Sequence, residues 1–266
     1  MKAACETSNL PATNRRSWAT IVIALFCLLP PSAQPYGATE TLSNVPFVGC
    51  ASDGQVGPRD APAGTPREVP IPSGLASELA YYKAEDGFGV LAPRGWNCFE
   101  TYGSNGETLY VSPEPINAGK VFSNDWKGFD GPVVQLTGEY GGTSGRFGVA
   151  RTIAKVFPAH RSFARSVIRE GIEPATSFPF GPYRNDKLRY KGNDVVEYQT
   201  PPNTEGLGTN SRLRKSDRRI DGVAILVGPS SEPNLIFLAV KLPATSLNLS
   251  QAMIQQVERD VPGSSR

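Results

Sequence analysis

The sequence predicts an α+β protein, with a mostly antiparallel sheet built from hairpins and about three helices packed on one of its faces. Three observations support this prediction. Runs rich in aromatic and β-branched residues recur along the chain, short Gly- and Asn-containing turns join several of them, and only three segments show a helical spacing of apolar residues. Hairpins connect antiparallel neighbours, whereas parallel strands need long crossovers, so we expect an antiparallel sheet.

The composition is that of an ordinary globular protein. The chain has 266 residues, of which 39% are hydrophobic and 20% are charged. A chain of this length buries a sizeable core without help, so we expect no cofactor. By composition the chain divides into residues 1–38, a Pro/Gly-rich segment over 39–72, and one α+β domain over 73–266.

Residues 1–38 have the order of an export signal. Lys2, Arg15 and Arg16 precede a 12-residue apolar run from Trp18 to Leu29, after which prolines and small residues follow. Because a membrane-spanning helix needs roughly 20 apolar residues, we expect no stable membrane span after signal removal. The protein is then secreted or periplasmic. The cleavage site stays open, as does an uncleaved anchor, and the paired arginines leave twin-arginine export beside general export.

The charge balance argues against a nucleic-acid partner. Without residues 1–38, which contain three basic residues and one acidic residue, the chain has equal numbers of acidic and basic residues. A neutral chain has no general attraction for nucleic acid or for an anionic membrane surface. We therefore expect an unidentified protein or small-molecule partner.

Cys50 and Cys98 are the only cysteines outside the leader. An even pair in an exported chain predicts a disulfide. Two free thiols or a redox pair are the alternatives, although no Cys-x-x-Cys motif is present. Two cysteines and the single histidine cannot complete a usual zinc site, so we expect no metal.

The segments up to residue 112 contain the two parts that this disulfide would join. Six prolines and four glycines over 39–72 disfavour a helix or a central strand, so an extended arm is expected there. Ser73 begins a predicted helix that reaches about Ala84, and strand sequence follows over 87–93. The stretch Gly95–Ser112 then predicts a hairpin around Asn105-Gly106.

The middle of the chain predicts another hairpin and then a helix. Strands are expected over 133–140 and 146–157, since Ala150, Thr152, Ala154 and Val156 alternate with polar or larger residues. Pro158 starts a predicted helix over 158–170. It carries His160 and a row of arginines at four-residue spacing. That row could bind an anion, but a solvated basic face explains it more simply.

A third hairpin is predicted from 187–190 and 194–200, followed by a long loop over 201–219. Loops of this length are usually functional or mobile. Its basic cluster includes Arg212, Arg214 and Lys215. Apolar runs over 222–228 and 235–242 predict strands buried on both faces, and a last helix is expected over 249–261.

No motif for a known catalytic reaction is present, so the sequence favours an exported, non-enzymatic binding or accessory protein. The candidate binding residues come from the basic loop and from the aromatic hairpin; they are Arg212, Arg214, Lys215, Trp96 and Tyr102. The alternative is a secreted or periplasmic hydrolase. Such an enzyme would use a carboxylate pair on a glycan, drawn from Asp125, Glu139 and Glu100, or His160 as a base.

Overall fold

The computed structural model describes residues 40–261 and confirms the α+β class. In this part of the chain there are thirteen strands and four α-helices, more than the sequence predicts. The strands are β1 (Glu40–Val45), β2 (Phe47–Gly49), β3 (Ser52–Gly54), β4 (Arg67–Pro72), β5 (Leu79–Lys83), β6 (Val90–Pro93), β7 (Asn97–Gly103), β8 (Gly106–Ser112), β9 (Val133–Glu139), β10 (Lys187–Tyr190), β11 (Val195–Thr200), β12 (Ile220–Val227) and β13 (Asn234–Lys241). The helices are α1 (Ala118–Val121), α2 (Arg146–Val156), α3 (Arg161–Arg169) and α4 (Ser250–Asp260).

An eight-stranded sheet forms the centre of residues 40–261. Its strand order is β10-β11-β12-β13-β9-β8-β7-β3, and every neighbouring pair is antiparallel except β3 and β7. The predicted hairpins β7–β8 and β10–β11 are both present, as is the pair β12–β13. The antiparallel, hairpin-built sheet is therefore confirmed. Strand β9 lies between β8 and β13, although about a hundred residues separate β9 from β13 in the sequence.

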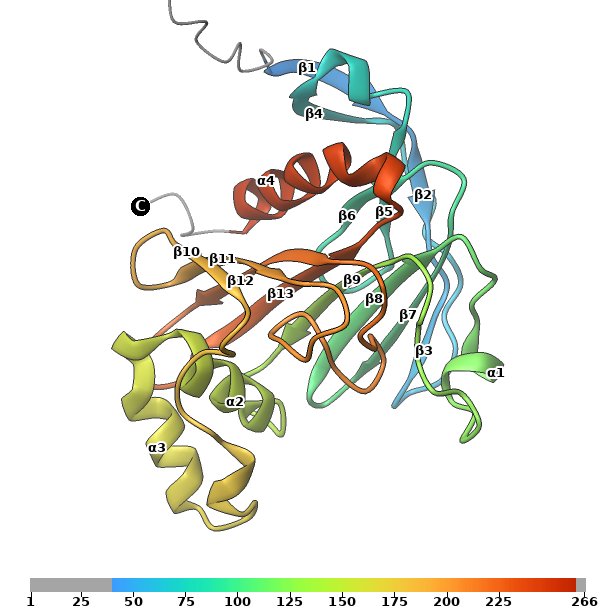
Figure 1. Ribbon diagram of the computed structural model, residues 1–266. Helices are drawn as coiled ribbons and strands as arrows, with labels where there is room; N and C mark the ends of the chain where they lie inside the picture. Colours follow the sequence, from blue (N-terminus) through green and yellow to red (C-terminus); the bar gives the residue numbers. More distant parts are fainter. Residues whose placement is uncertain (1–39, 262–266) are drawn as a thin grey trace, which may run out of the picture. The chain divides into compact units, whose positions relative to one another are not determined.

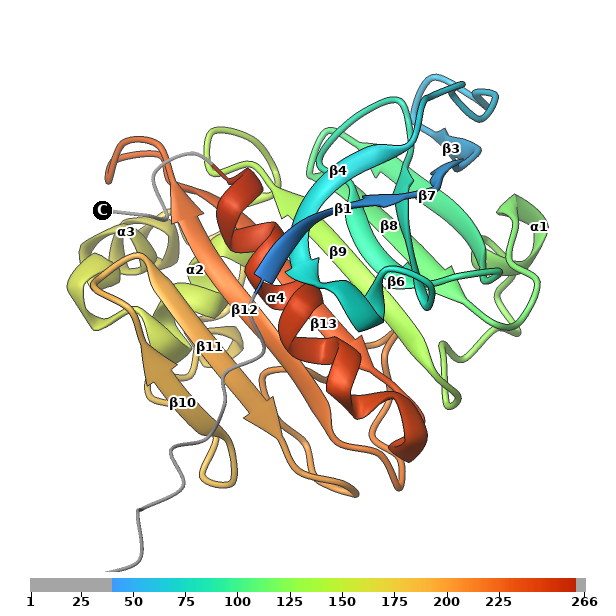
Figure 2. The same ribbon diagram turned by 90° about the horizontal axis from the view of Figure 1, so that it is seen from above.

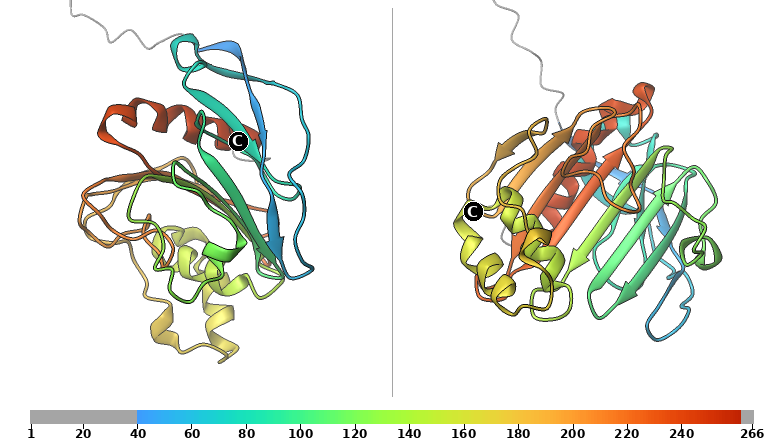
Figure 3. Two further views of the ribbon diagram at one scale, coloured as in Figure 1. Left: turned by 90° about the vertical axis from the view of Figure 1, so that its right-hand side faces the viewer. Right: turned by 60° about the horizontal axis from the view of Figure 1, so that its bottom comes forward.

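Helices cover both faces of this sheet rather than the single face expected. Helix α4 lies on one face, whereas α2 and α3 lie on the other (Figure 1). The buried apolar residues accordingly form two clusters. One contains Met253 and Val257 of α4 with Leu238 of β13, and the other contains Ile153 of α2 and Val167 of α3. Seen from the side of α2 and α3, strands β7 and β8 lie beside these helices and not beneath them (Figure 3).

A smaller sheet of β2, β5 and β6 and a two-stranded ribbon of β1 and β4 complete the α4 side (Figure 2). The buried side-chain amide of Gln256 joins α4 to β6. Its Oε1 accepts a hydrogen bond from the Leu91 amide at 2.8 Å, and its Nε2 donates one to the Gly89 carbonyl at 3.1 Å. The ribbon is held to the C-terminal end of α4 by an ion pair between Arg67 and Asp260.

The disulfide between Cys50 and Cys98 is present, with an S–S distance of 2.03 Å. It connects the segment between β2 and β3 to the first strand of the hairpin, as the sequence predicts. The extended arm over 39–72 is not confirmed. From Glu40 onward this segment supplies β1 to β4, and its prolines lie in short or edge strands and in the turns between them.

The predicted helix over 73–84 is wrong. A short 3₁₀ helix at Ser73–Leu75 is followed by strand β5. Four consecutive residues of β5, from Leu79 to Tyr82, are buried, because β5 pairs with β2 on one edge and β6 on the other and is covered on both faces. A strand that is buried on both faces does not show the alternation of apolar and polar residues that identifies a strand in sequence. The apolar residues over 73–84 therefore have a spacing that also suits a helix.

The predicted strand over 146–157 is also wrong, because these residues form α2. The apolar residues of this segment fit both the two-residue period of a strand and the 3.6-residue period of a helix. Val149, Ala150, Ile153, Ala154 and Val156 are all buried, and their spacing places them on one helical stripe against the sheet. Its small alanines let the helix pack closely on the sheet. The first strand of that expected hairpin, β9, is correct, as are the predicted helices that correspond to α3 and α4.

Residues 1–38, the predicted export signal, lie outside the described residues, as do residues 262–266. Within 40–261, no helix has the length and hydrophobicity required to cross a membrane.

Candidate functional site

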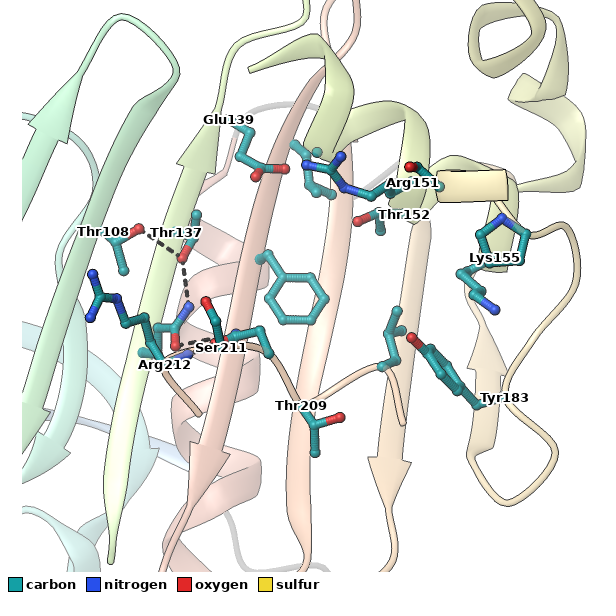
Figure 4. A pocket seen from close by; sticks show the side chains of 18 of the residues that line it. Thr108, Thr137, Glu139, Arg151, Thr152, Lys155, Tyr183, Thr209, Ser211 and Arg212 are labelled. Carbon is teal, nitrogen blue, oxygen red and sulfur yellow. Dashed lines mark hydrogen bonds between the residues drawn. The ribbon is translucent and has the colours of Figure 1, made fainter. Parts of the chain in front are cut away.

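A cavity of about 550 Å³ opens on the sheet face that carries α2 and α3 (Figure 4). Its floor consists of residues from β8, β9 and β13. Helix α2 forms one wall, and segments 177–183 and 207–212 form the others. The last of these segments belongs to the long loop over 201–219 that the sequence identifies as a candidate binding loop.

The floor of the cavity carries a connected chain of hydroxyl and amide groups. Thr108 Oγ1 and Thr137 Oγ1 share a hydrogen bond of 3.2 Å, and Gln135 Nε2 donates to Thr137 Oγ1 at 3.1 Å. Asn210 Nδ2 from the loop donates to Gln135 Oε1 at 3.4 Å. These side chains point to the same face because residues alternate along a strand. Such a floor offers both donors and acceptors to a polar ligand.

The loop over 201–219 is packed against the protein rather than solvated throughout. Leu213 is fully buried, and the Phe129 amide donates to the Arg212 carbonyl at 2.6 Å. The buried ammonium of Lys241 donates to the carbonyls of Phe129 and Arg214 at 2.8 and 3.0 Å. Burial lowers the pKa of this ammonium to about 8. These bonds fix the wall of the cavity and the position of Arg212.

Two cations of the cavity lining form no ion pair with a carboxylate among the described residues, although the charge of Lys155 lowers the pKa of the nearby Asp186 against the larger effect of burial. Lys155 Nζ lies 4.2 Å from the centre of the Tyr183 ring, and the Arg212 guanidinium lies 4.8 Å from the Trp126 ring. Both are cation–π contacts, in which the ring carries no formal negative charge. The third cation of the lining, Arg151, pairs with Glu173 at 2.7 Å. The cavity therefore has an excess of positive charge.

Glu139 is the one carboxylate among the residues that line the cavity. Burial raises its pKa to about 7, against the opposite effect of the nearby Arg151 charge. Near neutral pH this group is therefore present in both protonation states, and its protonated form can donate a hydrogen bond. Figure 4 shows Glu139 and Arg151 on the same side of the cavity, facing each other.

The structure brings only Arg212, of the five predicted binding residues, to this cavity. Arg214 pairs with Asp130, and Lys215 pairs with Glu205 at 3.3 Å, both at exposed positions. Trp96 packs against the apolar cluster on the α4 side of the sheet. The Tyr102 hydroxyl donates to the Gly57 carbonyl, and Arg59 lies over its ring.

The other predicted catalytic candidates do not line the cavity with Glu139. Glu100 is buried on the opposite face of the sheet, where burial and the neighbouring Glu107 raise its pKa to about 8. Asp125 is exposed and outside the lining. His160 Nε2 is 2.6 Å from Asp194 Oδ1, a contact that joins the start of α3 to the turn before β11. Between residues 40 and 261, no three His, Cys, Asp or Glu side chains form a metal-binding group.

Sequence reasoning missed most of the lining, although one signal was available. Gln135, Thr137 and Glu139 are polar at every second position of an otherwise apolar strand, a pattern that places them on one face. Lys155 and Arg151 belong to residues 146–157, for which the sequence predicts a strand and no contact with a site. Their approach to the cavity depends on the helical form of α2.

The fold and this site define an α+β protein with a polar, positively charged cavity on one face of an antiparallel sheet. No protein-family model matches the chain, and neither a curated protein nor a solved structure does.

Proposed function

We propose that this chain is an exported binding protein, and that the cavity beside α2 holds a small, hydroxylated ligand with a negative charge. A sugar acid is the ligand class that fits these groups. The observation that carries the proposal is the excess of cations over carboxylates in the lining, in which Lys155 and Arg212 form no ion pair in the described chain. The leader sequence and the Cys50–Cys98 disulfide support export to an oxidising compartment.

The floor of the cavity supports a ligand that is hydroxylated as well as charged. Thr108, Thr137 and Gln135 form one hydrogen-bonded chain, and Thr209 and Ser211 add further hydroxyls at the loop wall. The Tyr183 and Phe237 rings in the lining can pack against the apolar face of a sugar ring. The volume of about 550 Å³ is typical of small-molecule sites.

A hydrolase that uses Glu139 is the second candidate. Its raised pKa of about 7 favours it, because a general acid works best with a pKa near the working pH. However, glycoside hydrolysis generally uses two carboxylates about 5–10 Å apart, and Glu139 is alone among the lining residues. Binding without hydrolysis is therefore the better-supported function. Release of reducing sugar from acidic glycans that disappears in Glu139→Gln would favour the hydrolase.

Calorimetric titration at pH 6 tests the binding proposal with galacturonate, glucuronate and the uncharged sugar galactose. We expect saturable binding of at least one sugar acid and at least tenfold weaker binding, about 1.4 kcal/mol, of galactose. Lys155→Gln and Arg212→Gln should each weaken binding of the acid. Lys215→Gln is the matched control, because it removes one positive charge from the same loop outside the cavity. Equal affinity for the acids and galactose, or no binding of either acid, would refute the proposal.

A further inference from the structure

A second, smaller groove lies on the opposite face of the central sheet, between α4 and strands β10, β11 and β12. Its volume is about 300 Å³. Leu247, Ser250, Gln251 and Ile254 line it from the helical side, and their spacing places them on one face of the helix. Figure 2 shows α4 above β12 and β13, with β11 and β10 to one side.

The hydroxyl of Ser250 is the first unusual feature of this groove. Ser250 is only 4% exposed, and its Oγ has no hydrogen-bond partner within the described chain. Burial of a hydroxyl without a partner costs folding free energy, so such groups are rare in native proteins. It is the first residue of α4, which continues directly from a 3₁₀ helix at Ala244–Leu249. A ligand in the groove would supply the missing partner.

Among the charged side chains that line the groove, one cation forms no ion pair with a carboxylate of the described chain. Both oxygens of Asp221 already accept hydrogen bonds, from Gln199 Nε2 at 2.8 Å and from Arg219 Nε at 3.1 Å. Glu197 pairs with Arg189 and Lys191. Lys187 has no carboxylate within ion-pair distance in the described part of the chain.

The strand register places Lys187 in the same cross-strand row as Asp221, whose two oxygens already accept hydrogen bonds. Lys187 is opposite Gln199, and Gln199 is opposite Asp221, so all three project to the α4 side of the sheet. The groove thus combines a free ammonium group, a free buried hydroxyl and carboxylates that are already neutralised. This combination favours a group that is negatively charged and accepts hydrogen bonds.

We propose that this groove is a second binding site, for a small carboxylate, with Lys187 as the charged partner and the Ser250 hydroxyl as a donor. The volume of the groove suits a molecule of about a dozen non-hydrogen atoms, at the small end of ligand sites. The site is independent of the cavity beside α2, because the two share no lining residue and lie on opposite faces of the sheet.

Titration of the ¹⁵N-labelled protein with succinate, malate and citrate tests the proposal, with succinamide as an uncharged match to succinate. We expect saturable shifts of the Lys187, Ser250 and Gln251 amides with at least one carboxylate, with a Kd below about 1 mM, and none with succinamide. Lys187→Gln and Ser250→Ala should each weaken binding about tenfold or more. The Ser250→Ala protein should melt at the same temperature as the native protein or higher, since the alanine buries no unsatisfied hydroxyl.

Two control variants make the result specific. Lys127→Gln removes an exposed positive charge away from both sites, and Lys155→Gln removes one from the cavity beside α2. Both should bind the carboxylate as tightly as the native protein does. The proposal is overturned if none of the three carboxylates saturates, if the shifts fall on the other cavity, or if Lys187→Gln and Ser250→Ala bind with native affinity.

Discussion

Gly148 of α2 and Glu139 of β9 are in direct contact, and a Cβ atom at position 148 would lie 2.0 Å from Glu139 Oε1. The absence of a side chain at Gly148 lets the helix approach the strand here and keeps the carboxylate at the edge of the cavity. A glycine inside a helix lowers the stability of the helix. At Gly148 this loss accompanies the close packing of α2 against Glu139.

The first prediction concerns this contact. Gly148→Ala should stabilise the protein by about 1 kcal/mol in a Glu139→Ala background, where only the helix propensity changes. In the native background the gain should be smaller, because the carboxylate must move away from the new Cβ. Denaturant unfolding of the four proteins of this double-mutant cycle measures the difference. Equal gains in both backgrounds would show that the two residues are not coupled.

The second prediction concerns the pH dependence of binding in the same cavity. Because the pKa of Glu139 is about 7, the cavity gains a negative charge as the pH rises through this value. Affinity for a sugar acid should therefore fall between pH 6 and pH 8. Glu139→Gln should remove most of this decrease, whereas the exposed control Glu85→Gln should retain it. Calorimetric titration with galacturonate across this range gives the result, and identical pH profiles for the native protein and Glu139→Gln would contradict it.

The third prediction concerns the disulfide. Cys50 and Cys98 are 48 residues apart, and replacing both by serine should lower the free energy of unfolding by about 2–4 kcal/mol. Urea unfolding of the variant, and of the native protein with and without reductant, measures this loss. Intact mass after alkylation should show no reactive thiol at either position before reduction. Two alkylated residues without reductant would refute the bond.

The fourth prediction uses the buried carboxyl of Glu100. Its pKa is raised from 4.5 to about 8, so the folded state holds the proton more tightly than the unfolded chain does. The stabilising effect is complete below pH 4.5 and is lost as the pH rises through 8. Glu100→Gln should therefore be more stable than the native protein at pH 8.5, by about 2–4 kcal/mol, and similar to it near pH 4.5. Thermal unfolding at both pH values tests this, and a constant difference would exclude the proposed titration.

The fifth prediction concerns the buried ammonium of Lys241. Lys241→Met should cost about 2–4 kcal/mol, because the buried carbonyl of Phe129 and the partly buried carbonyl of Arg214 lose their donor. The pKa of Lys241 is lowered to about 8, so the unfolded chain binds the proton more tightly, and native stability gains from this group between pH 8 and pH 10.5. The stability difference between the native protein and Lys241→Met should therefore widen over this range.

Hydrogen exchange at the Arg214 amide should also become faster in the variant, and unchanged exchange would show that Lys241 does not hold the loop.

Local sequence was sufficient where a structure depends on neighbouring residues. The hairpin of β7 and β8 follows from Asn105-Gly106 and its flanking aromatic residues, and the disulfide follows from two cysteines in a chain whose first residues predict export. The length and basic residues of the loop over 201–219 predict a binding element, and Arg212 from this loop lines the cavity.

Tertiary packing determined the secondary structure of the segments whose apolar spacing suits both a helix and a strand. Residues 146–157 alternate like a strand, yet they form α2 because a helical stripe from Val149 to Val156 buries against the sheet. Residues 79–83 have apolar spacing that suits a helix, yet they form β5 because strands on both sides pair with it. In such short segments, the energy of burial exceeds the small difference in local propensity.

The sequence by itself determined the α+β class, the β7–β8 and β10–β11 hairpins, the paired cysteines and the loop that carries Arg212. Only the tertiary structure decided which residues share a cavity, because that depends on strand order. The pairing of β9 with β13 brings Gln135, Thr137 and Glu139 beneath α2, across about a hundred residues of chain. Contacts over such separations are selected by the packing of the whole sheet and leave no local pattern in the sequence.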